Sequence, residues 1–421
     1  YCWYKTGNKT SKIKFMTSEK FIRNRTALIT LIAASLVVLI SLGIRQTFGM
    51  FFMDFRDDLG TSLTQSGLSV GLQMLMWGLT GPIFGVIADK YGGHKAISLA
   101  FIFYITGIYF LYAGPNTGIF FQLDLGILVG IGLGGTAISI PMSVVGKHFP
   151  LSNRTIAMSI VTAIGSFGYF LSPILTTYSL TENGWQTTLL AFIIALFVGL
   201  CLSFFVRSPS LEQTIEKPNT QSTTDAIKEA FGSKSYILLV SGFFVCGFHI
   251  TLVGTHVPTY VIDRGLESWT AAAILSLIGL FNIFGSLTSG YLSTKISKKI
   301  ILSAIYSLRG LSIILFIFLP ASNINSFIFG ASFGFLWLST VPATSGIVAH
   351  LFGTKYLGML YGIVFLSHQI GSFFGAYLGG LFHDLYGSYD YAWYLAIALS
   401  LFAAIIHLPI KEEPVLRLKT E

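Results

Sequence analysis

TALITLIAASLVVLISLGIRQTFGMFF, residues 26–52, is the stretch of sequence that decides the fold class. It carries a single charge, Arg45, and is otherwise dominated by apolar residues. At about 1.5 Å per residue, an α-helix of this length crosses the roughly 30 Å of hydrocarbon in a bilayer. A signal peptide has an apolar core of only about 7 to 15 residues, so we expect a retained transmembrane helix here.

Arg45 lies in the second half of this expected helix. An arginine at membrane depth costs about 2.5 to 3.5 kcal/mol on insertion scales, so such residues face a protein interior or a watery cavity and mark transport pathways. Arg45 is therefore a candidate anion-binding residue. The alternative is that its side chain extends to the nearby membrane interface or pairs with a neighbouring group.

The composition of the whole chain indicates a polytopic membrane protein. Hydrophobic residues make up 53 % and charged residues 10 % of the 421 residues, and the mean hydropathy is +0.72. A soluble domain has about 25 % charged residues. The net charge of +8 is spread over short segments and forms no continuous basic patch, so we expect no nucleic-acid binding. The three cysteines show neither metal nor redox spacing, and no cofactor is expected.

Apolar stretches long enough to span a membrane recur along the chain. They predict an all-α membrane protein with twelve transmembrane helices in two pseudo-symmetric six-helix bundles. The expected helices cover residues 26–52, 66–88, 96–113, 118–142, 155–178, 187–206, 235–260, 269–293, 300–319, 324–348, 357–383 and 391–410.

The polar stretches define the domain organisation. A basic cytoplasmic arm, residues 1–25, precedes the first helix, and its first fifteen residues precede Met16 and could be non-native. A cytoplasmic linker rich in Pro, Ser, Thr and charged residues separates the two bundles. The expected segments are the N-terminal bundle, 26–206, the linker, 207–234, the C-terminal bundle, 235–410, and a cytoplasmic tail, 411–421.

The distribution of Lys and Arg predicts the orientation. With both termini in the cytoplasm, the inner segments hold 22 of these residues, and the outer loops hold only Arg56 and Arg264. This asymmetry fits the positive-inside rule. We therefore expect a multi-pass protein of the cell membrane, plasma or inner, with both termini cytoplasmic.

An internal repeat supports two related halves. The sequence Ile-Gly-Ser-Phe occurs at residues 164–167 and again at 370–373, and Pro141 in the first half matches Pro342 in the second. Parallel halves related by an axis along the membrane normal are a recurrent transporter plan, with the substrate site at their interface.

GVIADKYGGHK, residues 85–95, resembles the signature loop of the major facilitator superfamily, G-x-x-x-D-(R/K)-x-G-x-(R/K). Glycines allow tight packing in such a turn, and the acid can interact with a neighbouring helix end. The resemblance implies that Asp89 is a conformational latch rather than a substrate ligand. The residues expected to control the conformation are Gly85, Asp89, Lys90, Gly92 and Lys95.

A narrower resemblance covers the first three helices. FGMFFMDF at residues 48–55 and GPIFG at 81–85 resemble the monocarboxylate transporter family, which carries lactate, pyruvate and related organic anions, usually with a proton. In that family a basic residue stands just before the first-helix glycine, and here Arg45 lies four residues before Gly49.

The chain departs from that family in the eighth helix. Monocarboxylate transporters carry an aspartate and an arginine one turn apart there, and the aligned positions hold Asn282 and Ser286, which have no charge. If transport is proton-coupled, another titratable group must carry the proton.

The seventh helix offers candidates for that group. His249, His256 and Tyr260 share one helical face at 3.6 residues per turn. An unperturbed imidazole titrates near pH 6.5, which suits a protonation switch. The alternative is that each histidine makes a hydrogen bond between helices.

Arg309, in the ninth helix, is the deepest charge in the chain. Its cost in the membrane requires a polar partner, which is either the substrate or a structural group. The resemblance to the superfamily argues for a structural partner, because the ninth helix is usually peripheral. Weaker inward candidates, each with a packing role as the alternative, are Trp337, Thr340 and Thr344 on the tenth helix, His368, Gln369 and Ser372 on the eleventh, and Trp77, Ser166 and Tyr169 in the first half.

These observations predict a secondary active transporter that moves a small, monocarboxylate-like organic anion by alternating access, as a monomer and together with a proton. Arg45 would hold the carboxylate by a charge-assisted hydrogen bond. Alternatives are a superfamily exporter of hydrophobic or drug-like compounds and a non-transporting membrane sensor. An enzyme is not expected, because no nucleophile–base pair or metal set is apparent. The candidate substrate-binding residues are Arg45, His249, His256, Tyr260, Asn282, Arg309 and Trp337.

Overall fold

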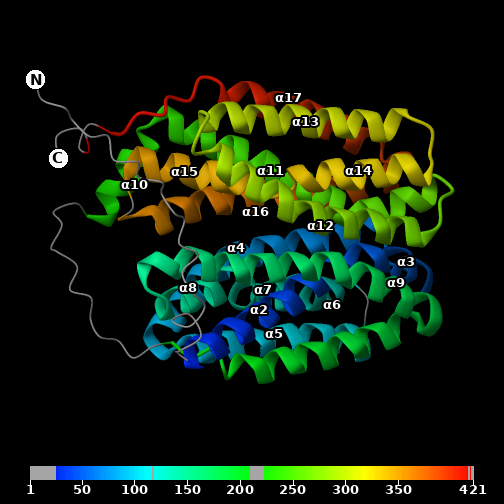
Figure 1. The fold of residues 1–421 in the computed structure, drawn as a ribbon. Coiled ribbons are helices and arrows are strands. Elements are labelled where there is room, and N and C mark those ends of the chain that lie inside the picture. The colour runs from blue at the N-terminus through cyan, green and yellow to red at the C-terminus, as the bar shows by residue number, and fades with distance from the viewer. Residues whose placement is uncertain (1–24, 116–117, 209–221, 354, 416–417, 419–421) are drawn as a thin grey trace, which may run out of the picture.

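Two helical bundles lie side by side in the computed structural model (Figure 1). The structure describes residues 25–115, 118–208, 222–353, 355–415 and 418, and these contain helices and no strand. The expected basic arm, apart from Arg25, and the middle of the expected linker lie outside the described residues. We refer to the end of the molecule that carries α10 as the linker end, and to the opposite end, where α3 lies, as the distal end (Figure 1).

The N-terminal bundle comprises the elements before residue 204, and the C-terminal bundle those after residue 233. The first contains α2 (Arg25–Gln46), η1 (Phe48–Phe51), α3 (Phe52–Leu59), α4 (Leu63–Tyr91), α5 (Gly93–Ala113), α6 (Ile119–Phe121), η2 (Gln122–Leu128), α7 (Val129–Thr136), α8 (Ser139–His148) and α9 (Leu151–Ser203). After the short α10 (Thr223–Phe231), the second contains α11 (Lys234–Asp263), α12 (Ser268–Leu292), α13 (Lys298–Phe318), α14 (Asn323–Leu336), α15 (Thr340–Phe352), α16 (Leu357–Tyr386) and α17 (Asp390–His407).

The described residues include 11 helical stretches that are long and apolar enough to cross a membrane. One of them, α9, has 53 residues and is broken at Gly184, where φ is +76°. Ser179 and Thr188 would lie about 13.5 Å apart along a straight helix, yet their hydroxyl oxygens are 2.8 Å apart. The chain therefore reverses at Gly184, and α9 supplies two spans. This gives the twelve expected helices, with a tight helical reversal where a loop was expected at residues 179–186.

The fourth and tenth spans are interrupted in the same way. Pro141 is the third residue of α8 and Pro342 the third residue of α15, so the two prolines that match in the sequence repeat occupy equivalent places. Proline is tolerated in the first turn of a helix, where no intrahelical partner for its nitrogen is needed. Each proline therefore begins a new helix, and the residues before it leave the helical path. The tenth span, expected as one helix, is divided at residues 337–339.

The two bundles meet along two pairs of helices, α4 with α16 and α9 with α12. At the distal end, α4 and α16 are in backbone contact, because a Cβ atom on Gly380 would lie 2.1 Å from the carbonyl oxygen of Leu63. Gly362 lies on the same face of α16, since 18 residues are five whole turns. A Cβ atom on Gly362, or on Gly358 one turn before it, would meet no atom within 4 Å. The bundles are therefore closed at the distal end and leave α16 uncovered toward the linker end.

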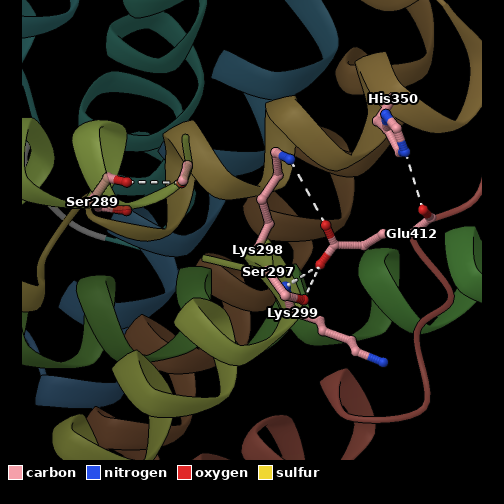
Figure 2. A network of polar contacts seen from close by, with 7 residues as sticks. Ser289, Ser297, Lys298, Lys299, His350 and Glu412 are labelled. Atoms are coloured by element: carbon pink, nitrogen blue, oxygen red, sulfur yellow. Dashed lines mark hydrogen bonds and ion pairs between the residues drawn. The ribbon is translucent and has the colours of Figure 1, made fainter. Parts of the chain in front are cut away.

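A polar network at the linker end ties the segment after α17 to the C-terminal bundle (Figure 2). The Glu412 carboxylate accepts hydrogen bonds from the Ser297 hydroxyl at 2.6 Å and from the Lys299 backbone N–H at 2.8 Å. It also lies 3.8 Å from the Lys298 ammonium group. His350 on α15 reaches the Glu412 carbonyl oxygen at 3.0 Å. This carboxylate thus occupies the N-terminus of α13, where helix dipoles favour negative charge.

Candidate functional site

Arg45 lies in the last turn of α2, just before the chain tightens into η1. Its side chain is half-buried and reaches toward α4. One Nη atom lies 3.4 Å from Gln46 Oε1, and the other lies 3.5 Å from the Met74 sulfur. The guanidinium carbon is 5.6 Å from the centre of the Trp77 ring. Tyr169 of α9 lies close to Arg45.

The Arg45 guanidinium is incompletely paired. Its Nε atom is buried and has no hydrogen-bond partner. None of the four ion pairs among the described residues includes Arg45. Buried polar groups are normally satisfied, and an unpaired one is costly. This cation therefore has capacity for an anionic group that the protein itself does not supply within the described residues.

A second incompletely paired group lies beside Arg45. The Gln46 amide nitrogen is buried without a partner. Its amide group approaches Gly254 of α11, where a Cβ atom would lie 3.8 Å from Gln46 Oε1 and 3.6 Å from the Trp337 ring. Residues of α2, α11 and the break before α15 therefore converge at this point. Trp337, expected from the sequence to face inward, lies here, whereas Gln46 was not anticipated, although it is a polar residue adjacent to Arg45 in an apolar helix.

Asn282 connects the two bundles rather than presenting a free polar group. Its side-chain nitrogen donates to the Ser166 hydroxyl of α9 at 3.2 Å, across the boundary. Its side-chain oxygen accepts from the Leu338 N–H at 3.0 Å, within the break between α14 and α15. Where the resembling family has a charge, this chain therefore has a buried amide that holds an interrupted helix and a helix of the other half.

The structure brings His249, His256 and Tyr260 onto one side of α11, as their spacing indicates, but that side faces away from Arg45. His249 Nε2 bonds to the Ala396 carbonyl oxygen of α17 at 2.8 Å. His256 Nε2 bonds to the Ala376 carbonyl oxygen of α16 at 2.6 Å. The Tyr260 hydroxyl accepts a hydrogen bond from Arg264. These contacts are the hydrogen bonds between helices that were the alternative for the two histidines.

Arg309 is fully buried and bound to backbone carbonyls. Its Nε and Nη2 atoms donate to the carbonyl of Leu336, at 3.2 and 2.7 Å, and Nη2 also donates to the carbonyl of Trp337. These carbonyls end α14, where no further helical turn is available to accept from. A cation is favoured at such a C-terminus. Of the two alternatives for Arg309, the described contacts are those of a structural partner.

A contact across the boundary lies beside Arg45. Gln369 of α16 donates its side-chain N–H to the Met74 carbonyl at 3.0 Å. Met74 is also the residue whose sulfur contacts Arg45. Sequence reasoning missed Met74, because an apolar side chain in an apolar helix carries no signal for such a role.

The signature loop, between α4 and α5, contacts α8 at the linker end. The Asp89 carboxylate accepts from Lys147 of α8 at 2.6 Å, between side chains that are 70 % and 42 % exposed. Exposed ion pairs of this kind contribute little stability. Gly92 has φ of +97°, a region that suits glycine. The Asp89 side chain thus contacts a neighbouring helix end, and Lys90 lies 5.2 Å from the Tyr91 ring.

The fold and these contacts define a polytopic membrane transporter built from two halves. The Major Facilitator Superfamily profile matches residues 31–341. The chain therefore belongs to the major facilitator superfamily, which confirms the expected fold class.

Relatives of known name support the assignment. An uncharacterized MFS-type transporter, YcxA of Bacillus subtilis, is 24 % identical over 82 % of this chain and 85 % of its own length. Monocarboxylate transporter 13 of Rattus norvegicus is 23 % identical over 85 % and 83 %. The Agnestins efflux protein AgnL12 of Paecilomyces divaricatus is 23 % identical over 91 % and 85 %. The resemblance to monocarboxylate transporters is thus confirmed at low identity, and efflux proteins are similarly related.

Solved structures show the same fold. A bacterial homologue of the human lysosomal transporter Spinster, in an inward-facing and unoccupied conformation, matches with a TM-score of 0.76, 15 % identity and coverage of 91 % of this chain and 96 % of the other. A D-xylose–proton symporter matches with a TM-score of 0.71, 14 % identity and coverage of 92 % and 99 %.

Proposed function

We propose that this protein is a secondary transporter of small organic anions of the monocarboxylate type, and that Arg45 binds the anionic group. The observation that carries the proposal is the Arg45 guanidinium, which is half-buried beside the boundary of the two halves and has no acidic partner among the described residues. Guanidinium and carboxylate groups form strong, often bidentate, hydrogen bonds.

The surroundings of Arg45 suit a small anion with an apolar body. Trp77 and Met74 supply an aromatic and a thioether surface next to the charge. The buried Gln46 amide supplies a further hydrogen-bond donor that lacks a partner. A carboxylate could therefore bind both groups while its hydrocarbon part contacts the ring.

Alternating access follows from the asymmetry of the boundary. We place both termini and the linker in the cytoplasm, in agreement with the Lys and Arg distribution, and the site lies within one chain, so a monomer suffices. The end closed by Leu63 and Gly380 then faces outward, and the uncovered face of α16 opens inward. For the opposite state, the contacts between Asn282 and Ser166 and between Gln369 and Met74 must break.

The direct test is counterflow in proteoliposomes. Purified protein is reconstituted, loaded with an unlabelled monocarboxylate such as lactate or pyruvate, and offered the labelled compound outside. Arg45→Gln should strongly reduce the exchange, whereas Arg56→Gln, which removes an exposed arginine paired with the adjacent Asp57, should retain it. Equal exchange by the Arg45 variant and the wild type would exclude Arg45 from the site.

A second candidate function is export of larger amphiphilic compounds. It is favoured by the aromatic surroundings of the site, where Trp77 contacts Phe365 at a ring separation of 5.9 Å, and by the efflux proteins among the relatives. The same assay with a panel of hydrophobic and drug-like compounds separates the two functions.

A further inference from the structure

We infer that His368 of α16 is the residue that binds the co-transported proton, in direct communication with the anion held by Arg45. This inference rests on the proposed function and names the proton site that the neutral Asn282 cannot provide. His368 is the twelfth residue of the 30-residue helix α16, near mid-membrane, and its side chain is buried.

A continuous row of rings joins His368 to Arg45 across the boundary. The imidazole lies parallel to the Phe365 ring, with an angle of 9° and 5.6 Å between the ring centres. Phe365 contacts Trp77 of α4, in the other half, at 5.9 Å. The Trp77 ring in turn lies beneath the Arg45 guanidinium at 5.6 Å.

A hydrogen-bonded path runs between the same two residues. His368 Nδ1 lies 3.0 Å from Gln369 Oε1. The nitrogen of the same Gln369 amide donates to the Met74 carbonyl at 3.0 Å, and the Met74 sulfur lies 3.5 Å from Arg45. Because a backbone carbonyl only accepts, the amide nitrogen must face Met74 and the amide oxygen must face His368. Nδ1 therefore carries the hydrogen in neutral His368, and Nε2 is the nitrogen that would take a second proton.

No carboxylate is among the contacts of His368 in the part of the chain that the structure describes. The contacts of His368 include the Cys246 thiol of α11, and the titratable or charged groups near that thiol are Arg309 and Tyr306 of α13 and Tyr361 of α16. Two of the three guanidinium nitrogens of Arg309, Nε and Nη2, donate to the carbonyls that end α14, and Nη1 has no partner within the described ranges. Protonated His368 would therefore lack a carboxylate counter-ion among the described residues.

Because His368 lacks a carboxylate partner among the described residues, binding of the proton and binding of the anionic substrate favour each other. Two cations, Arg45 and protonated His368, would face one boundary without an acid, and an incoming carboxylate supplies the missing charge. By linkage, the bound anion increases the affinity of His368 for its proton, and the proton increases the affinity for the anion by the same factor. Transport of one proton with one monoanion moves no net charge.

The other buried histidines lack this connection. His249 bonds to α17, and His256 contacts Phe52 at the closed distal end, at a ring separation of 5.7 Å. His407 bonds to the Ala403 carbonyl of its own helix, α17, and stacks on Tyr306. His407 therefore provides a matched control, as a buried histidine outside the path to Arg45.

The test compares His368→Asn, His368→Gln and His407→Gln in proteoliposomes with labelled lactate. In the wild type, counterflow should increase as both sides are acidified from pH 7.5 to 5.5, and an inward gradient of one pH unit should drive about tenfold accumulation. Both His368 variants, which present neutral amides, should show counterflow that no longer depends on pH, and no accumulation in the gradient. A pH-sensitive dye trapped inside should report proton entry with lactate in the wild type and in His407→Gln only.

Retained accumulation and proton entry in both His368 variants would overturn the inference. So would a loss of proton coupling in His249→Gln or His256→Gln while the His368 variants remain coupled. These results would leave the anion site at Arg45 standing. Absence of any Arg45-dependent counterflow in the wild type would instead remove the proposed function, and the inference with it.

Discussion

Gln369 of the C-terminal half donates a hydrogen bond of 3.0 Å to the carbonyl of Met74 in the N-terminal half. Both residues also contact groups of the candidate site, since the Met74 sulfur approaches Arg45 and the Gln369 oxygen approaches His368. A change in the relative position of the halves therefore alters the surroundings of the cation and of the imidazole together. Such a shared contact provides the differential interaction that a substrate needs to shift a conformational equilibrium.

Arg45 should act through its charge as well as its shape. A hydrogen bond to a charged group contributes about 1.5 to 3 kcal/mol, so Arg45→Gln should weaken monocarboxylate binding by about 10- to 100-fold. Arg45→Lys retains the charge without the planar fork and should lose less. Binding is measured from the substrate concentration dependence of counterflow, with Arg56→Gln as the control. Equal losses in the Lys and Gln variants would argue against a role for the charge.

Arg309 should affect stability before it affects binding. Arg309→Leu leaves the carbonyls of Leu336 and Trp337 without their donors, and an unsatisfied buried group costs about 1 to 3 kcal/mol. We expect the Tm of Arg309→Leu in detergent, measured by differential scanning fluorimetry, to be several degrees lower than that of the wild type. Arg45→Gln should leave the Tm close to the wild-type value. An unchanged Tm for Arg309→Leu would contradict the structural role.

Asp384 should hold the distal end closed. Its Oδ2 atom accepts from the Thr64 N–H at 2.7 Å and from the Thr64 hydroxyl at 2.6 Å, between α16 and α4. Asp384→Ala removes both bonds between the halves, so the distal end should open more often. Spin labels at Asp57→Cys and Leu385→Cys, in a background without the three native cysteines, would report longer distances in double electron–electron resonance.

Thr64→Val tests the same contact from the other side, because it removes the hydroxyl and keeps the backbone donor. Its distance distribution should lie between those of the wild type and Asp384→Ala. Identical distributions in all three proteins would show that this contact does not control closure.

Glu412 should make stability depend on pH. Burial acts to raise the pKa of Glu412, but the hydrogen bonds from Ser297 and Lys299 and the charges of Lys298 and His350 outweigh it, and the pKa lies below its ordinary value. A carboxyl whose pKa is lower in the folded state stabilises the fold above its unfolded pKa, and the contribution is lost as the pH falls through the folded value. Glu412→Gln should therefore lower the Tm by about 1 to 3 °C at pH 7.

The same substitution should have less effect in acid. As the pH falls through the lowered pKa of Glu412, the wild-type carboxyl also becomes neutral, so the two melting curves should converge. Tm values for both proteins between pH 3.5 and 7.5 test this. A difference that stays constant over that range would contradict the assigned role of the charge.

Most of the fold could be predicted because each membrane span is recognisable in the sequence as a long apolar stretch. A bilayer requires a helix of about 20 apolar residues for each crossing, so the number of spans and the division into halves followed from length and polarity. The reversal between the fifth and sixth spans was expected as a loop at residues 179–186. Its form could not be predicted, because the helical path continues on both sides of Gly184 and turns back at the positive φ of that single residue.

The candidate site could be predicted only in part. Arg45 was identifiable because an isolated charge in an apolar transmembrane helix is costly and therefore indicates a polar environment. The side of α11 that carries His249 and His256 could also be predicted, but not which helix would face it, because periodicity describes one helix and not its neighbour. The partners of Arg309 were unpredictable for a related reason, as backbone carbonyls released at a helix break have no signature of their own.

Gly362 and Gly380 occupy equivalent angular positions five turns apart on α16, one facing empty space and the other touching the backbone of α4. A surface without side chains lets two helices separate or approach without any rotamer having to change. The uncovered turns of α16 near the linker end carry glycine as the packed turns at the distal end do. The helix can therefore exchange its close packing at the distal end for close packing at the linker end at little conformational cost. A bulky residue at position 362 would prevent close packing of α16 at the linker end. It would hold the molecule in the state described here, closed at the distal end, without changing a ligand contact.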